Sequence, residues 1–442
     1  MITDMRKWLF TAIFFTMHIG LRAQQITYYD DIEPIIIKNC APCHRPNEAA
    51  PFSLLTYPDV AKRASFIKDV VSQRYMPPWR ADNKYVHFAN DRSLAQTDID
   101  KIVKWVDDKA PEGTAAAKPV SIKQPIAGTM YNRAPDMILK MESGFMVKGD
   151  GGERFLIFKI PFELKDTFNV EAVEFFSNNK KLVHHVNYAF HPVPDTAVDL
   201  YNTDASINLT EGDRTRFNQY QPYRKSITYY GGWIPGATYE SYPKELGWVM
   251  PKRGVVLLTV HYAPAVKDEE SVCGVHLFFK KTPVKRAVKV ISFGSGGIGE
   301  KEIYPSPFYI KANEVKTFHL NLSNPGEDLS IMYVWPHMHY IGKEYKAYLT
   351  NQKGDTTRLV HIPDWDFRWQ EIYKFKKLVK VPKGSIIHIE GTYDNRASNP
   401  SNPNNPPTTI WSFGDMQSTN EMLTLMMVFL PYKPGDENMV LQ

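Results

Sequence analysis

The spacing of apolar residues changes once along this chain of 442 residues. In the first quarter they recur at helical intervals, which predicts helices around 32–36, over 58–72 and over 97–106. Beyond residue 130 they form short runs bounded by Gly, Pro and Asn, which is typical of strands, at 155–158, 172–176, 254–260 and 423–429. The pattern predicts a multidomain chain: a small all-α domain followed by two all-β antiparallel sandwich domains, jelly-roll-like, at 131–284 and 285–442.

The first 23 residues have the order of a secretory signal peptide. Arg6 and Lys7 precede an apolar run over 8–21, and the small residue Ala23 follows it. This run is shorter than the roughly 20 residues that a membrane-spanning helix needs. We therefore expect cleavage, no transmembrane span in the mature chain, and a periplasmic or secreted location. An uncleaved membrane anchor is the alternative.

Composition and charge narrow the class of protein. With 53 basic and 48 acidic residues the formal charge is only +5 and no basic cluster stands out, which argues against a nucleic-acid partner. A hydrophobic content of 43% is enough for a buried core. Three cysteines exclude a disulfide framework. Small residues and Pro without periodicity indicate a linker over 114–130.

The segment Cys40-Ala-Pro-Cys43-His44 is the attachment signature of a c-type haem. Two thiols bond to the porphyrin and the adjacent imidazole becomes an iron ligand, so the pattern predicts one covalent haem c. A thioredoxin-like dithiol would follow a strand in a βαβ unit, and a zinc site would need a second ligand pair nearby. The sequence shows neither arrangement.

The second iron ligand is expected from the loop before the last predicted helix. Met76 lies in Tyr-Met-Pro-Pro-Trp, a segment made rigid by two prolines, and His87 is the alternative. A His/Met pair favours electron transfer over oxygen binding. With its helices, the region 24–113 resembles a small class I cytochrome c.

Five of the remaining histidines gather in three places. In a strand, residues i and i+2 point to one face, so His337 and His339 can bind one ion. The adjacent His184 and His185 need a β-bulge or a loop to converge, and His261 ends an apolar run. A single histidine in a strand is more often a structural residue than a ligand.

Ligand type indicates the metal. Imidazoles combined with a thioether favour copper, because sulfur stabilises Cu(I) and nitrogen stabilises Cu(II). A zinc site would more often include a carboxylate or thiolate. The candidate thioether is Met422, where the chain enters an apolar run.

The order of these motifs resembles the copper type II, ascorbate-dependent monooxygenases, the peptidylglycine α-hydroxylating and dopamine β-hydroxylating enzymes. The chain is similar to a bacterial branch in which such a body follows a cytochrome c. The resemblance covers about residues 130–435 and rests on His184-His185, Val-His261-Tyr, Cys273-Gly-Val-His-Leu, His337-Met-His339, Asp364–Gln370, the Asn/Pro-rich segment from Tyr393, and Asn420-Glu-Met422.

The resemblance implies two coppers that face each other across a solvent-filled cleft between the sandwiches. One, which relays electrons, would be held by His184, His185 and His261. The other, where oxygen binds and substrate is hydroxylated, would be held by His337, His339 and Met422.

The chain also departs from this family. Trp335 stands where the peptide-amidating enzymes have an Arg, and Thr424 and Met426 stand where they have Asn and Tyr. We therefore reject peptide amidation. Cys273 has no free cysteine partner, so the disulfides of the family are missing and Cys273 is expected to be a small buried residue.

Together these features predict an enzyme, a copper-dependent monooxygenase that hydroxylates a C–H bond of a small molecule with O₂. An external donor would reduce the haem, and the domain order suggests transfer from the haem to the His-only copper and then to the Met-bearing copper. A non-catalytic haem and copper electron-transfer or copper-binding protein is the alternative, and a carbohydrate- or surface-binding sandwich is a third class. We expect purely structural roles for 364–370, as an aromatic-packed strand, for the loop 395–407, and for five single histidines, His191, His276, His319, His361 and His388.

Overall fold

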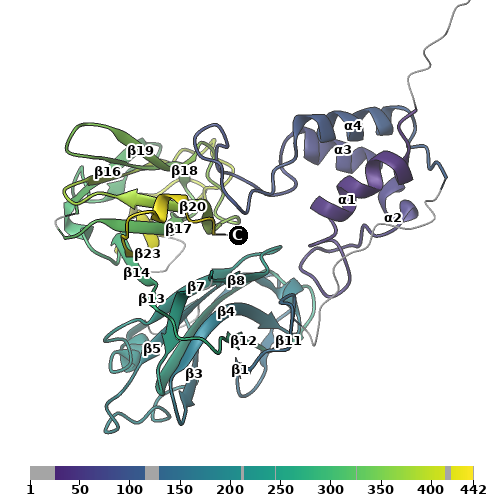
Figure 1. The fold of residues 1–442 in the computed structure, drawn as a ribbon. Helices are drawn as coiled ribbons and strands as arrows, with labels where there is room; N and C mark the ends of the chain where they lie inside the picture. The colour runs from purple at the N-terminus through teal and green to yellow at the C-terminus, as the bar shows by residue number, and fades with distance from the viewer. Residues whose placement is uncertain are drawn as a thin grey trace, which may run out of the picture.

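Antiparallel β-sheets make up most of the regular structure in the computed structural model (Figure 1), which describes residues 25–114, 129–210, 214–243, 245–324, 326–413 and 420–441. The predicted signal peptide and most of the predicted linker lie outside these residues. Among the described residues, no helix combines the length and the apolar character that a membrane span requires.

Short helices form the described N-terminal region, residues 25–114. They are a π-helical turn at Tyr28–Ile32, α1 (Glu33–Asn39), α2 (Tyr57–Ala61), α3 (Ala64–Ser72) and α4 (Gln96–Asp107). Their apolar faces share one core, in which Ile36, Ile102 and Trp105 are fully buried. The predicted helix over 58–72 is two helices, because Arg63 at the break donates to the Asp59 carbonyl and places its guanidinium 4.3 Å from the centre of the Phe52 ring.

Two sheets enclose the core of the first β unit, residues 129–287. The six-stranded sheet has the order β1 (Met137–Lys140), β12 (Cys273–Phe279), β4 (Phe168–Ser177), β9 (Leu246–Met250), β13 (Arg286–Ala287), with β8 (Tyr239–Ser241) also on β4. The five-stranded sheet has the order β6 (Ser206–Asn208), β3 (Arg154–Glu163), β10 (Arg253–Tyr262), β5 (Val183–Pro192), β7 (Tyr229–Trp233). A small ribbon pairs β2 (Phe145–Val147) with β11 (Glu269–Ser271).

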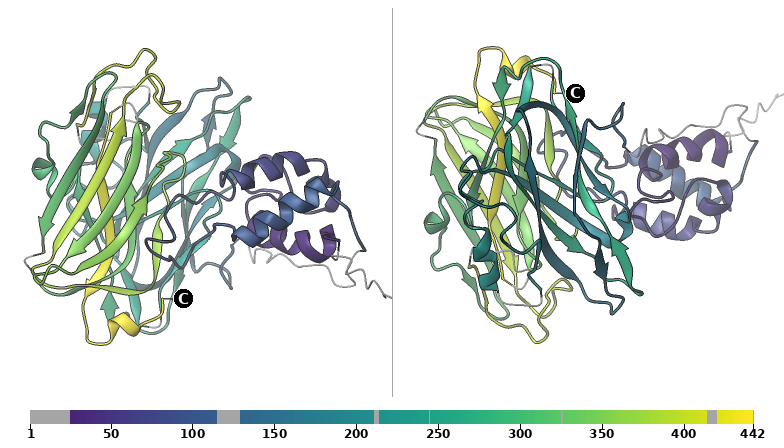
Figure 2. Two further views of the ribbon diagram at one scale, coloured as in Figure 1. Left: turned by 90° about the horizontal axis from the view of Figure 1, so that it is seen from above. Right: turned by 90° about the horizontal axis from the view of Figure 1, so that it is seen from below.

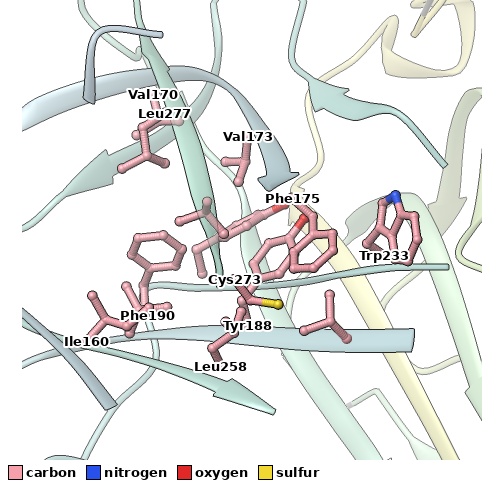
Figure 3. Close-up of a cluster of buried hydrophobic side chains, with 14 of the residues drawn as sticks. Ile160, Val170, Val173, Phe175, Tyr188, Phe190, Trp233, Leu258, Cys273 and Leu277 are labelled. Carbon is pink, nitrogen blue, oxygen red and sulfur yellow. The ribbon is translucent and has the colours of Figure 1, made fainter. Parts of the chain in front are cut away.

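Side chains from both sheets interdigitate in this core (Figure 3), among them Phe175, Phe190 and Trp233. Cys273 lies within it, fully buried and as a free thiol. The prediction of a small buried residue at Cys273 is confirmed.

The second β unit, residues 288–441, has two four-stranded sheets. One has the order β14 (Lys289–Gly294), β23 (Thr424–Pro431), β17 (Leu329–His337), β20 (Tyr373–Val381), and the other β16 (Val315–Ser323), β21 (Ile386–Asp394), β18 (Gly342–Thr350), β19 (Thr356–Ile362). A ribbon pairs β15 (Tyr309–Ile310) with β22 (Ile410–Trp411). Four 3₁₀ turns complete the described elements, at Lys180–Leu182, Arg214–Tyr220, Glu300–Glu302 and Asp436–Asn438.

The N-terminal helices lie at one end of the two β units (Figure 2). The segment 79–92, between α3 and α4, leaves the helices and packs on the second β unit, where Trp79 and Phe88 join its core. Phe88 forms an isolated β-bridge with Phe375, and Ala89 N–H donates to the carbonyl of Lys374 at 2.7 Å. This segment and Tyr75, whose hydroxyl accepts from the guanidinium of Arg368, hold the N-terminal region against the second β unit.

Candidate metal centres and haem-attachment motif

A β-bulge brings the first three histidines together. The β5–β10 ladder pairs His185 with His261 but Val183 with Tyr262, so His184 is the extra residue on β5. An extra residue turns the strand locally and lets neighbouring side chains share a face. The requirement for a bulge at His184-His185, predicted from the sequence, is confirmed.

The ligand atoms of His184, His185 and His261 all lie within 4.8 Å of one another. Nδ1 of His184 is 3.0 Å from Nδ1 of His261, a separation that two nitrogens at about 2.0–2.1 Å from one ion can adopt. Nδ1 of His185 is buried and has no hydrogen-bond partner among the described residues. These nitrogens fit a metal ion.

Burial keeps these imidazoles neutral. It lowers the pKa of His184 to about 4, and it also lowers the pKa values of His185 and His261. The neutral imidazole is the form that binds metals, so the cluster would release no protons from its rings on binding at pH 7.

Glu153 lies beside the third imidazole. Its Oε2 lies 3.3 Å from Nε2 of His261 and accepts a hydrogen bond of 2.5 Å from the hydroxyl of Tyr340. Burial alone would raise the pKa of Glu153, but its contacts with His261 and Tyr340 lower the pKa, so the carboxylate is charged. Nε2 of His261 is buried and forms no hydrogen bond among the described residues, so Glu153 acts on this ring through its charge.

The second pair of histidines lies where β17 ends. His337 is the last residue of the strand and His339 lies beyond it, yet the ring centres are 4.9 Å apart. Nδ1 of His337 is 2.5 Å from Oε1 of Gln370, whose amide nitrogen donates to the Phe367 carbonyl. The amide oxygen therefore accepts from Nδ1–H of His337. Nε2 of His337 is then an acceptor, and it is buried without a hydrogen-bond partner in the described part of the chain.

The segment that carries Met422 surrounds His339. Nδ1 of His339 is 2.8 Å from the Asn420 carbonyl, and the backbone N–H groups of His339 and Ile341 donate to the carboxylate of Glu421. Met422 itself is buried, and its carbonyl accepts from the Tyr393 hydroxyl at 2.7 Å. The contacts bring the chain at Met422 beside His339, while ligation by its sulfur stays a prediction.

The loop between β19 and β20, residues 363–372, contacts both histidine clusters; we call it the junction loop. The ring of Phe367, which is 4% exposed, has its centre 5.9 Å from that of His185, 6.0 Å from that of His261 and 5.7 Å from that of His339. The resemblance implies a solvent-filled cleft between the two sites, but the described residues place this buried ring against both clusters.

The predicted strand over 364–370 is wrong. The side chain of Asp366 accepts hydrogen bonds from the backbone N–H and the guanidinium of Arg368, which stabilises a turn in place of an extended chain. The expectation of a purely packing role there also fails at Gln370, which contacts His337 directly. In the loop 395–407 the amide of Asn395 donates to the carbonyls of Ile310 and Thr408, and the structural role expected of this loop stays a prediction.

The Cys40–His44 motif forms a tight turn after α1. The His44 N–H donates to the Cys40 carbonyl at 2.9 Å, and Nδ1 of His44 lies 3.0 Å from the Phe52 carbonyl. A carbonyl on Nδ1 leaves Nε2 to bind a metal, which fits an axial iron ligand. Cys40 and Cys43 are free thiols, and burial raises the pKa of Cys40 to about 12. These residues fit covalent haem attachment.

Met76 and His87 are the two candidates for the second iron ligand. Met76 is half-buried in the loop after α3, and its N–H donates to the Val70 carbonyl at 3.2 Å. His87 is exposed. Met76 lies just before the segment 79–92, which packs on the second β unit. Ligation of the haem iron by Met76 stays a prediction.

Sequence reasoning missed four residues of these sites: Glu153, Tyr340, Phe367 and Gln370. Glu153 and Tyr340 carry no spacing signal, because each meets its partner only in the fold. The segment from Asp364 to Gln370 did carry one, since three aromatic residues alternate with charges in a stretch too polar for a core strand.

No family model matches the chain, and no curated protein matches it. Among the solved structures, the major capsid protein P2 from bacteriophage PM2 has a TM-score of 0.24 and 8% identity, over 68% of this chain and 99% of that chain. Infectious bursal disease virus, Gt strain, has a TM-score of 0.14 and 12% identity, over 70% and 87%. The PBSX exported protein XepA has a TM-score of 0.12 and 11% identity, over 56% and 88%. At these TM-scores the likenesses carry no argument.

Proposed function

We propose that this chain is an exported copper-dependent monooxygenase that receives electrons through its own c-type haem. The observation that carries the proposal is the convergence of His184, His185 and His261, from two strands and across a bulge, into one buried set of nitrogens. Three neutral imidazoles suit copper and zinc alike, and the choice of copper rests on the thioether of Met422 that is predicted to join His337 and His339.

The second copper would be held by His337, His339 and Met422, in the resemblance the site of O₂ chemistry. Gln370 and the Asn420 carbonyl each accept from an Nδ1–H, so both rings turn Nε2 towards the ion. Copper bound here would supply the redox chemistry that inserts one oxygen atom of O₂ into a C–H bond. The protein supplies fixed imidazoles and a site largely shielded from water.

The N-terminal region would be a cytochrome c-like domain with one covalent haem. Cys40 and Cys43 would form the thioether bonds, His44 the first iron ligand and Met76 the second. Hydroxylation with reduction of the other oxygen atom to water consumes two electrons, and a haem relays electrons singly from an external donor. The two β units would then be the jelly-roll-like copper domains.

Metal analysis of the haem-loaded, periplasmically expressed protein tests this proposal. We expect two coppers in the wild type and about one in each of His337→Ala and Met422→Ala. His388→Ala is the control, because both ring nitrogens of His388 have other partners, Thr350 and Asn321, and this variant should retain both coppers. A wild type without copper contradicts the proposal.

A second measurement separates the enzyme from the alternative. Consumption of O₂ with a small reductant and a panel of C–H substrates supports a monooxygenase. Two bound coppers without O₂ consumption on any substrate would instead identify a haem and copper electron-transfer protein.

A further inference from the structure

We propose that electrons from the haem reach the proposed copper sites first at the His337–His339 pair, and not at the cluster of His184, His185 and His261. The route to the pair runs through Arg92, Glu371 and Gln370. This inference rests on the proposed function and reverses the order that the domain sequence suggests. In the step, Fe(II) becomes Fe(III), Cu(II) at the pair becomes Cu(I), and a small external reductant reduces the iron again.

The haem end of this route is Cys43, which would carry one thioether. The turn at Gly236 of the first β unit packs directly against it: a Cβ placed on Gly236 would lie 2.7 Å from Sγ of Cys43 and 2.8 Å from Nη1 of Arg92. The guanidinium of Arg92 and the thiol are therefore neighbours across a residue without a side chain. Any larger residue at Gly236 would separate them.

Arg92 links the haem end to the junction loop. Its Nη2 forms an ion pair with the carboxylate of Glu371, and its Nη1 donates to the Pro235 carbonyl at 3.2 Å. Only 24% of the Arg92 side chain and 9% of the Glu371 side chain are exposed, so water screens this pair weakly. Asn90 joins the segment that carries Arg92 to the junction loop, since its amide donates to the Ile372 carbonyl at 2.8 Å.

Gln370 completes the route, because it is covalently adjacent to Glu371 and its amide oxygen accepts from Nδ1 of His337 at 2.5 Å. The route thus reaches the imidazole on the side away from its metal-binding Nε2. A cavity of about 240 Å³ lies on this same side, lined by Arg92, Gly236, Trp335, Gln370 and Glu371 among others. Electron entry and metal binding therefore use opposite edges of one imidazole.

The competing route runs from the loop of Met76 to the His-only cluster. The guanidinium of Arg368 donates to the Tyr75 hydroxyl at 3.0 Å, and the adjacent Phe367 contacts His185 and His261. Its last step is a ring contact with centres 5.9 to 6.0 Å apart, with no hydrogen bond. The route through Gln370 also has one through-space step, between Cys43 and Arg92, but it reaches its metal-binding imidazole by a hydrogen bond, and we base the preference on this difference at the ligand.

The test follows the absorbance of the ferrous haem in the full-length, haem- and copper-loaded protein after one-electron reduction by a pulse of reducing radicals without O₂. We expect a fast reoxidation phase that persists in His184→Ala and disappears in His337→Ala. Gln370→Met, which keeps the side-chain volume but loses the acceptor, should slow the phase, because the hydrogen bond to His337 is then missing. Tyr75→Phe, which removes only the competing hydrogen bond, should leave it unchanged.

Copper analysis of every variant accompanies the kinetics and separates the two proposals. A fast phase lost in His184→Ala but kept in His337→Ala overturns this route while copper binding stands, as does a phase slowed by Tyr75→Phe and not by Gln370→Met. If Gln370→Met fails to retain copper, the comparison of His184→Ala with His337→Ala decides alone. A wild type that binds no copper overturns the proposed function, and this inference with it.

Discussion

The Glu153→Gln substitution tests how much the charge of Glu153 strengthens metal binding at the cluster of His184, His185 and His261. The carboxylate lies 3.3 Å from Nε2 of His261 and is charged, whereas a glutamine keeps the shape and can still accept a hydrogen bond from Tyr340. Loss of such a partner on a metal-binding imidazole lowers metal affinity about 10–100-fold, or roughly 1.4–2.8 kcal/mol. We expect a loss in this range for the copper proposed to bind at His184, His185 and His261.

Competition with a copper chelator of known affinity measures this loss, with the folded state checked by circular dichroism. Tyr340→Phe is the matched control, because it removes the other partner of the same carboxylate and leaves its charge on His261. Its copper affinity should fall less than that of Glu153→Gln. An affinity of Glu153→Gln equal to that of the wild type would refute the electrostatic support of the cluster by Glu153.

Two further predictions concern stability. Phe367→Ala removes a buried ring from between the clusters and should lower the free energy of unfolding by about 3–5 kcal/mol, measured by urea denaturation, with Phe367→Leu losing less. The pKa of Asp436 is lowered to about 2: burial alone would raise it, but hydrogen bonds from Arg286 and Ser330 outweigh that effect. A carboxyl whose pKa is lower in the folded state stabilises the folded protein above the unfolded pKa of about 3.9. About 2 kcal/mol of the free energy of unfolding should therefore be lost as the pH falls from 4 towards 2. The urea midpoint of Asp436→Asn should depend less on pH in that range.

The spacing of apolar residues predicted helices and strands because this spacing reflects which side of each element is buried. The apolar runs at 155–158 and 254–260 lie within β3 and β10, and adjacent histidines on a strand required a bulge that the β5–β10 ladder contains. Where a long-range contact overrides local preference, the prediction fails. Arg63 lies at the break of the expected helix over 58–72, where its guanidinium packs on Phe52 outside the helix, and the apolar periodicity of 58–72 does not reveal that contact.

The candidate ligands were identifiable from residue type and spacing, but their partners were not. Gln370 is 33 residues from His337, and Glu153 lies in the loop before β3, far along the chain from His261, so only the fold brings each pair together. A glutamine or glutamate at a loop has no periodicity to reveal it. The residues beside each imidazole are for this reason the part of a metal site that a single sequence predicts least.

A chain with a small helical N-terminal region, a predicted linker and two β units suggests a tethered electron carrier that docks by diffusion. The described contacts argue against free movement. Segment 79–92 contributes Trp79 and Phe88 to the core of the second β unit, and the junction loop holds the N-terminal region through Asp366 to Arg80 and through Glu371 to Arg92. A haem attached at Cys40 and Cys43 would therefore keep one position relative to His337, and its electron transfer would not require the region to undock.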